Sequence, residues 1–162
     1  MKTSYYAMMR QNLMKCPISV AGKCPSWYTG KQFKTLAPKY DWWIKWEEKA
    51  KEVGFDNLEN NLWYEEQYKQ TVLDKLSVKD VLIQLHLLAL CPLDEVTLLC
   101  YETPDKFCHR HLIANWLNEW YRKAMEKSTN GDVSDMEFCT FVGFHGVEES
   151  DYANIGTEKT GK

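Results

Sequence analysis

The sequence lacks most of the short motifs that identify enzyme classes. It contains no glycine-rich loop of the P-loop or dinucleotide-binding type and no Gly-x-Ser-x-Gly nucleophile elbow. Arg110 follows Cys108 by two residues, which excludes the Cys-x-x-x-x-x-Arg loop of cysteine phosphatases. None of the six cysteines forms a Cys-x-x-Cys pair, and their spacing matches no structural zinc pattern. These absences exclude the motif-defined classes, so the site must be argued from the placement of single residues.

Long apolar runs are also missing. The longest stretch, Val81 to Leu90, is interrupted by Gln84 and His86 and is too short to span a bilayer. The first ten residues contain no unbroken apolar segment of the kind found in signal peptides. We therefore expect no membrane contact and a cytoplasmic location, where the cysteines stay reduced as free thiols.

Acidic residues are absent from the first 40 positions, although the whole chain has a net charge of −3. These positions hold seven basic residues, whereas residues 41–162 hold 13 basic and 23 acidic residues, a net charge of −10. A basic and aromatic N-terminal quarter could face an anionic ligand, a nucleotide or a nucleic acid. A set of solvated lysines on loops explains the same pattern equally well.

The hydrophobic pattern favours one α/β domain. A chain of 162 residues is long enough for a single core. The clearest strand is predicted over 95–100, whose last five residues are largely apolar, as in strands buried on both faces. We expect a small, mainly parallel central sheet with helices on both faces, in a domain over 1–145, followed by a polar tail over 146–162.

The remaining elements are predicted from periodicity and from capping residues. Thr103 and Pro104 suit the N-cap and first position of the helix that follows the clearest strand. The other predicted elements are strands over 17–21 and 138–144 and helices over 41–53, 62–76 and 78–90.

The segment from Val96 to Ile113 is the most informative part of the sequence. A strand ends in Cys100, a short loop carries Glu102, and Cys108 precedes an amphipathic helix. Ligands of open α/β sheets bind at the carboxyl ends of the strands, and a helix N-terminus favours anions and thiolates. The order of strand, loop and helix therefore predicts a functional site here.

Each residue of this segment has a functional and a structural interpretation. Cys108 could be a nucleophile or proton donor, His109 an acid or base, and Arg110 a clamp for an anion. Cys100 and Glu102 would shape the pocket. Alternatively, Cys108 packs as a buried thiol, His109 bonds a loop carbonyl and Arg110 pairs with Glu102.

Two further possibilities involve the cysteines. Cys100 and Cys108 could pair transiently as a redox couple. Cys100, Cys108, His109 and His111 could bind a metal, but because their spacing matches no zinc pattern we predict neither a metal nor a cofactor.

Three pieces of the sequence resemble a known family. They are Leu98-Leu99-Cys100-Tyr101-Glu102 with Cys108-His109-Arg110, then Ile18-Ser19-Val20-Ala21-Gly22-Lys23 with Pro25-Ser26-Trp27-Tyr28, and Leu36-Ala37-Pro38. Between about Ile18 and Trp120 the chain resembles the domain of unknown function 488, or YeaO-like, family. The aromatic insert from Tyr40 to Tyr68 is less typical of that family.

The resemblance implies a single α/β domain of bacteria and their phages, in which the first two pieces converge at one site. It supplies no reaction. If the pieces converge, Lys23 would bring a positive charge close to Cys108-His109-Arg110. Flat aromatic faces would come from Trp27, Tyr28 and Tyr101. We expect an enzyme that acts on a nucleotide, a nucleic acid or another anionic substrate. The alternative is a non-catalytic protein that contacts nucleic acid or a protein partner.

Overall fold

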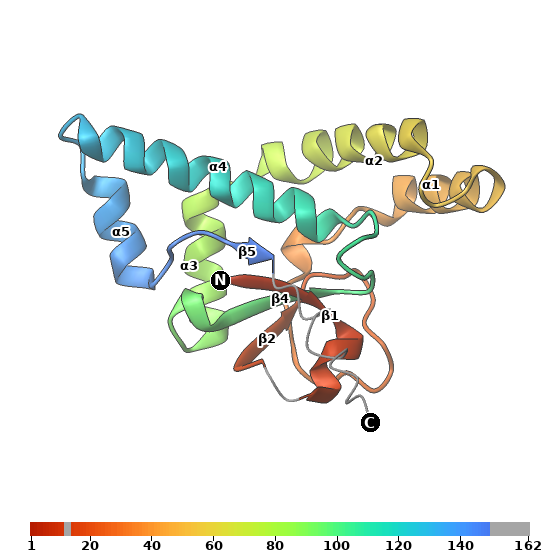
Figure 1. Ribbon diagram of the computed structural model, residues 1–162, viewed down its shortest axis with the longest axis horizontal. Coiled ribbons are helices and arrows are strands. Elements are labelled where there is room, and N and C mark those ends of the chain that lie inside the picture. The colour runs from red at the N-terminus through yellow and green to blue at the C-terminus, as the bar shows by residue number, and fades with distance from the viewer. Residues whose placement is uncertain (12–13, 150–162) are drawn as a thin grey trace, which may run out of the picture.

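A fully parallel sheet lies at the centre of the fold (Figure 1). The computed structural model describes residues 1–11 and 14–149. Its strands lie in the order β3-β2-β4-β1-β5, and every neighbouring pair is parallel. This arrangement confirms the predicted α/β class. The strands are β1 (Lys2–Tyr5), β2 (Cys16–Ser19), β3 (Lys31–Gln32), β4 (Val96–Cys100) and β5 (Glu148–Glu149).

The middle strand, β4, is buried along its whole length. It pairs with β2 on one side and with β1 on the other, so that Cys100 lies beside Tyr5 and Leu99 beside both Ser4 and Ser19. The predicted strand over 95–100 is therefore confirmed. Strand β1 was not predicted, because Lys2–Tyr5 is short and half polar.

The α-helices contribute to one large core that covers one face of the sheet. Successive residues of a strand point to opposite faces, and Leu98 belongs to this core whereas Leu99 belongs to a second, smaller cluster. The smaller cluster is covered by the 3-10 helix η1 (Tyr6–Gln11) and by Tyr28. Figure 1 shows α2 and α4 on the side of the sheet opposite to η1. The helices are α1 (Tyr40–Val53), α2 (Leu58–Thr71), α3 (Val78–Ala89), α4 (His109–Thr129) and α5 (Ser134–Val142).

Helix α4 begins later than its sequence predicts. The predicted start at Thr103 and Pro104 is wrong, because Cys108 is the N-cap and residues 101–108 form a loop. The Phe107 ring in this loop packs against Trp46 and Tyr64, at centroid distances of 6.0 and 5.0 Å. The chain must reach these rings before it turns into the helix.

Two expectations for the C-terminal part also differ from the structure. The predicted strand over 138–144 lies mostly in helix α5, where the buried residues Asp135, Cys139 and Val142 recur at helical spacing. The predicted tail begins with Gly146 and Val147, which are buried, and continues into β5, which pairs with β1. Residues 150–162 of the predicted tail lie outside the described residues.

None of the helices in the described part of the chain is both long enough and apolar enough to cross a bilayer.

Candidate functional site

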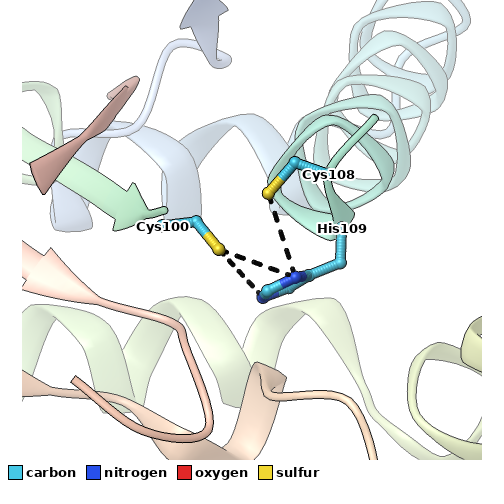
Figure 2. Close-up of side chains that lie close together, drawn as sticks. All are labelled: Cys100, Cys108 and His109. Atoms are coloured by element: carbon cyan, nitrogen blue, oxygen red, sulfur yellow. Dashed lines mark hydrogen bonds between the residues drawn. The ribbon is translucent and has the colours of Figure 1, made fainter. Parts of the chain in front are cut away.

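Two cysteines and a histidine meet where β4 ends and α4 begins (Figure 2). Cys100 is the last residue of β4, Cys108 is the N-cap of α4, and His109 is its first residue. Their sulfur and ring-nitrogen atoms all lie within 4.8 Å of one another, and all three residues are buried. We call these residues the thiol–imidazole cluster. Three of the residues predicted for the site are thus close together, and their functional roles stay predictions.

The imidazole of His109 is held by the backbone that follows β2. Its Nε2 lies 3.1 Å from the carbonyl oxygen of Val20. A carbonyl only accepts hydrogen bonds, so Nε2 is the donor, and in the neutral ring Nδ1 is the acceptor. Nδ1 lies 3.8 Å from the Cys100 sulfur and 4.0 Å from the Cys108 sulfur. Residues far apart in sequence thus fix both the tautomer and the direction of the ring.

The two thiols have different electrostatic environments. Burial alone would raise the pKa of Cys108, but a hydrogen bond from Cys100 and the neighbouring His109 and Arg110 hold that pKa well below its ordinary value. The hydrogen bond to Cys108, together with burial, holds the pKa of Cys100 well above its ordinary value. The N-terminus of α4 adds a further partial positive charge beside Cys108. Cys108 is therefore the thiol of the pair that ionises first.

Arg110 supports the loop before α4. Its side chain is 1% exposed, and its Nη1 donates a hydrogen bond to the backbone carbonyl of Glu102. Its Nη2 lies 3.4 Å from Nε2 of His111. Burial raises the pKa of the Glu102 carboxyl group. Arg110 is thus a positioning residue for the loop, and its role as an anion clamp stays a prediction.

A pocket of about 560 Å³ opens above the thiol–imidazole cluster. Its lining includes all three residues of the cluster, with Lys23, Tyr101 and Glu102. Most of the remaining wall is aromatic, and we call this cavity the aromatic pocket. Its rings come from Tyr40, Trp43, Trp46, Phe55, Tyr64 and Phe107.

The predicted substrate-binding residues divide into two groups. Lys23 and Tyr101 line the aromatic pocket, whereas Trp27 and Tyr28 lie outside its lining. Tyr28 is buried in the smaller core, where its hydroxyl donates to the carbonyl of Lys31 at 2.7 Å. Trp27 packs edge-on against Tyr6 at 6.0 Å and is 48% exposed.

The aromatic wall is the part of the site that sequence reasoning missed. Most of its rings come from α1, from α2 and from the turn between them, inside the segment that is less typical of the family. Their spacing predicts that Trp43 and Trp46 supply the apolar side of a helix, and only the non-catalytic alternative gives this tryptophan helix a binding role. The helical spacing of aromatic residues in both helices was the available signal, but it predicts core packing just as well.

The class of this protein is thus a single parallel α/β domain. At the junction of β4 and α4 it carries two thiols and an imidazole beneath an aromatic cavity. The chain belongs to the DUF488 family: the model of the active DUF488-N3 subclade matches residues 14–121. The matched region contains the thiol–imidazole cluster and every residue that lines the aromatic pocket. Searches of curated proteins and of solved structures gave no match.

Proposed function

We propose that this protein is an enzyme that binds a nucleotide, or one base of a single-stranded nucleic acid, in the aromatic pocket. The Cys108 sulfur then reacts with the bound substrate. One observation carries the proposal: the aromatic rings wall a cavity that has the thiol–imidazole cluster in its lining. Small-molecule sites typically measure about 300–1,000 Å³, and this cavity of about 560 Å³ lies within that range. It is too small for a duplex.

The walls and the entrance suit different parts of such a substrate. A planar base stacks on aromatic faces, and this contact is sequence-tolerant because every base has a π-face. Lys23 is exposed and lines the pocket, so its ammonium group can meet a phosphate. The carboxylate of Glu102 can accept hydrogen bonds from an exocyclic amine.

The cluster supplies the chemistry. The Cys108 sulfur forms a bond to an electrophilic atom of the substrate, and the bond from that atom to its leaving group breaks. The leaving group departs with the electron pair and takes a proton from solvent in the open pocket. Water then attacks the same atom and gives up a proton to solvent, and the bond to Cys108 breaks so that the product leaves and the Cys108 thiolate is regenerated. His109 and Arg110 hold Cys108 and its loop in place through the carbonyls of Val20 and Glu102.

The experiment begins with the thermal unfolding of the protein in the presence of nucleotides, nucleosides and short single-stranded oligonucleotides. A ligand of the folded state raises the melting temperature. Each ligand that does so is then incubated with the wild type, with Cys108→Ser and with the matched control Cys139→Ser, whose residue is buried outside the pocket lining. Mass spectrometry measures how much of the ligand is converted to product.

We expect conversion by the wild type and by Cys139→Ser, and binding without conversion by Cys108→Ser. Equal conversion by all three proteins would contradict the role of Cys108. Absence of any stabilising ligand would contradict the role of the pocket.

A non-catalytic role in binding nucleic acid is the second candidate. It is favoured by an aromatic surface formed by Trp27 and Tyr101, which are both 48% exposed and both contact the buried ring of Tyr6. If this role is the main one, Trp27→Ala weakens the binding of a fluorescent single-stranded oligonucleotide, whereas Cys108→Ser leaves it unchanged. Fluorescence anisotropy measures both.

A further inference from the structure

The thiol–imidazole cluster has the ligands and the spacing of a metal site. In a tetrahedral site with Zn–S bonds of about 2.3 Å and Zn–N bonds of about 2.0–2.1 Å, sulfur and nitrogen ligands lie about 3.6 Å apart. Nδ1 of His109 lies 3.8 Å from the Cys100 sulfur and 4.0 Å from the Cys108 sulfur. Closure by about 0.2–0.4 Å would therefore bring both sulfur–nitrogen pairs to the ideal separation.

The surroundings of His109 match those of a metal-bound imidazole. Such rings almost always donate their second N–H to a carbonyl or carboxylate, which fixes the ring and makes the ligating nitrogen more basic. Nε2 of His109 is 3.1 Å from the Val20 carbonyl oxygen, and Val20 is fully buried. The nitrogen left over, Nδ1, lies within 4.0 Å of both sulfurs of the cluster, and Nε2 lies 3.9 Å from the Cys100 sulfur.

The burial of the cluster also favours an ion. Cys100 and Cys108 are each 5% exposed, and two thiolates this close together repel each other in a medium of low dielectric constant. A divalent cation neutralises both of them and leaves a site with no net charge. Two thiolates and one imidazole form a ligand set that suits zinc among the common divalent ions.

We propose that Cys100, Cys108 and Nδ1 of His109 bind one zinc ion, whose fourth coordination position opens into the aromatic pocket. All three residues line that pocket, and catalytic zinc sites keep one position for water or substrate. The inference goes beyond the proposed function, because the cluster holds an ion whichever substrate enters. It is compatible with that function, because metal coordination is one of the ways in which a nucleophile is activated.

The test measures metal in the full chain purified without chelators. Elemental analysis is expected to find one zinc ion per chain, and chelation should remove it. Titration of the metal-free wild type with Co²⁺ should then give sulfur-to-cobalt charge-transfer absorption that saturates at one equivalent. Cys100→Ser and Cys108→Ser should each lose the stoichiometric zinc and most of this absorption, whereas the matched control Cys139→Ser should keep both.

The proposal is overturned if the wild type contains no zinc and Co²⁺ gives no charge-transfer absorption. It is also overturned if both Cys100→Ser and Cys108→Ser keep the zinc, or if the purified protein holds copper in place of zinc. If the serine variants do not unfold cooperatively, the wild-type cobalt titration decides alone. The binding of nucleotides to metal-free protein tests the proposed function separately, so either idea can fail while the other stands.

Discussion

Nε2 of His109 lies 3.1 Å from the carbonyl oxygen of Val20, and this hydrogen bond ties the start of α4 to the end of β2 across 89 positions of sequence. It joins the two segments that the family resemblance places at one site. The imidazole cannot turn without breaking its hydrogen bond to this buried carbonyl. The cluster is therefore held by the sheet as well as by the helix.

The first prediction concerns this hydrogen bond. His109→Phe keeps a ring of similar size but removes the donor, so the free energy of unfolding should fall by about 1–3 kcal/mol, the cost of an unsatisfied buried group. Urea denaturation of chelator-treated protein measures it without a contribution from bound metal. In the control, His86→Phe, the change should stay within about 0.5 kcal/mol, because Nδ1 of His86 is buried without a hydrogen-bond partner among the described residues. Equal losses in the two variants would contradict this account.

The second prediction concerns Arg110. Arg110→Met removes the donor to the Glu102 carbonyl, and hydrogen bonds from charged groups contribute about 1.5–3 kcal/mol. Amide hydrogen exchange over residues 101–107 should therefore become about tenfold faster or more, whereas exchange in the C-terminal half of α4 stays unchanged.

The matched control is Arg122→Met on the same helix, since Arg122 is exposed and pairs with Glu126 one turn away. It should leave the loop unaffected. If Arg110→Met also leaves loop exchange at the wild-type rate, the positioning role of Arg110 is wrong.

The third prediction is a pH dependence at the junction of three helices. Hydrogen bonds and ion pairs with Lys79 on α3 and Lys127 on α4 lower the pKa of Asp135, at the start of α5. A carboxyl group whose pKa is lowered by folding stabilises the folded state above its unfolded pKa, and this contribution is lost as the pH falls through the folded pKa.

Asp135→Asn should therefore lower stability by about 1–2 kcal/mol at neutral pH, because the carboxylate is 8% exposed while its lysine partners are about half exposed. The difference from the wild type should diminish as the pH falls below the unfolded pKa of about 3.9, and it should go on diminishing through the lowered folded pKa of Asp135. Thermal unfolding from pH 3 to 8 measures it, with the exposed Asp74→Asn as a control. A loss that is independent of pH would show that packing, and not charge, is responsible.

The strand at the centre of the site, and the presence of a loop and a helix after it, were predictable because each depends on local sequence. Val96–Cys100 is largely apolar, and Ser77 caps α3 by accepting a hydrogen bond from the Asp80 amide. The meeting of Cys100 with Cys108 follows from the rule that ligand sites lie at the carboxyl ends of parallel strands. This part of the site needs no knowledge of distant contacts.

The other features of the fold and of the site depend on contacts between residues far apart in the sequence, which local patterns do not predict. Helix α4 begins five positions after Pro104 because Phe107 packs against rings of α1 and α2. Strand β5 exists because Glu148 pairs with Lys2. The aromatic wall that includes Trp43 could not be predicted for the same reason. A ring that lines a cavity and a ring that fills a core recur with the same helical periodicity.

The most direct test of the central claim, that the aromatic pocket receives the substrate, compares two tryptophan variants. Trp43 lines the pocket and stacks on Tyr40 at 6.0 Å, whereas Trp116 on α4 is half-buried outside the lining. The dissociation constant of the nucleotide that stabilises the wild type most is measured by calorimetry for both alanine variants. Because stacking of a base on an aromatic ring contributes about 1–3 kcal/mol, Trp43→Ala should weaken binding about fivefold or more, and Trp116→Ala should match the wild type. Equal dissociation constants for Trp43→Ala and Trp116→Ala would place the ligand elsewhere and contradict the account.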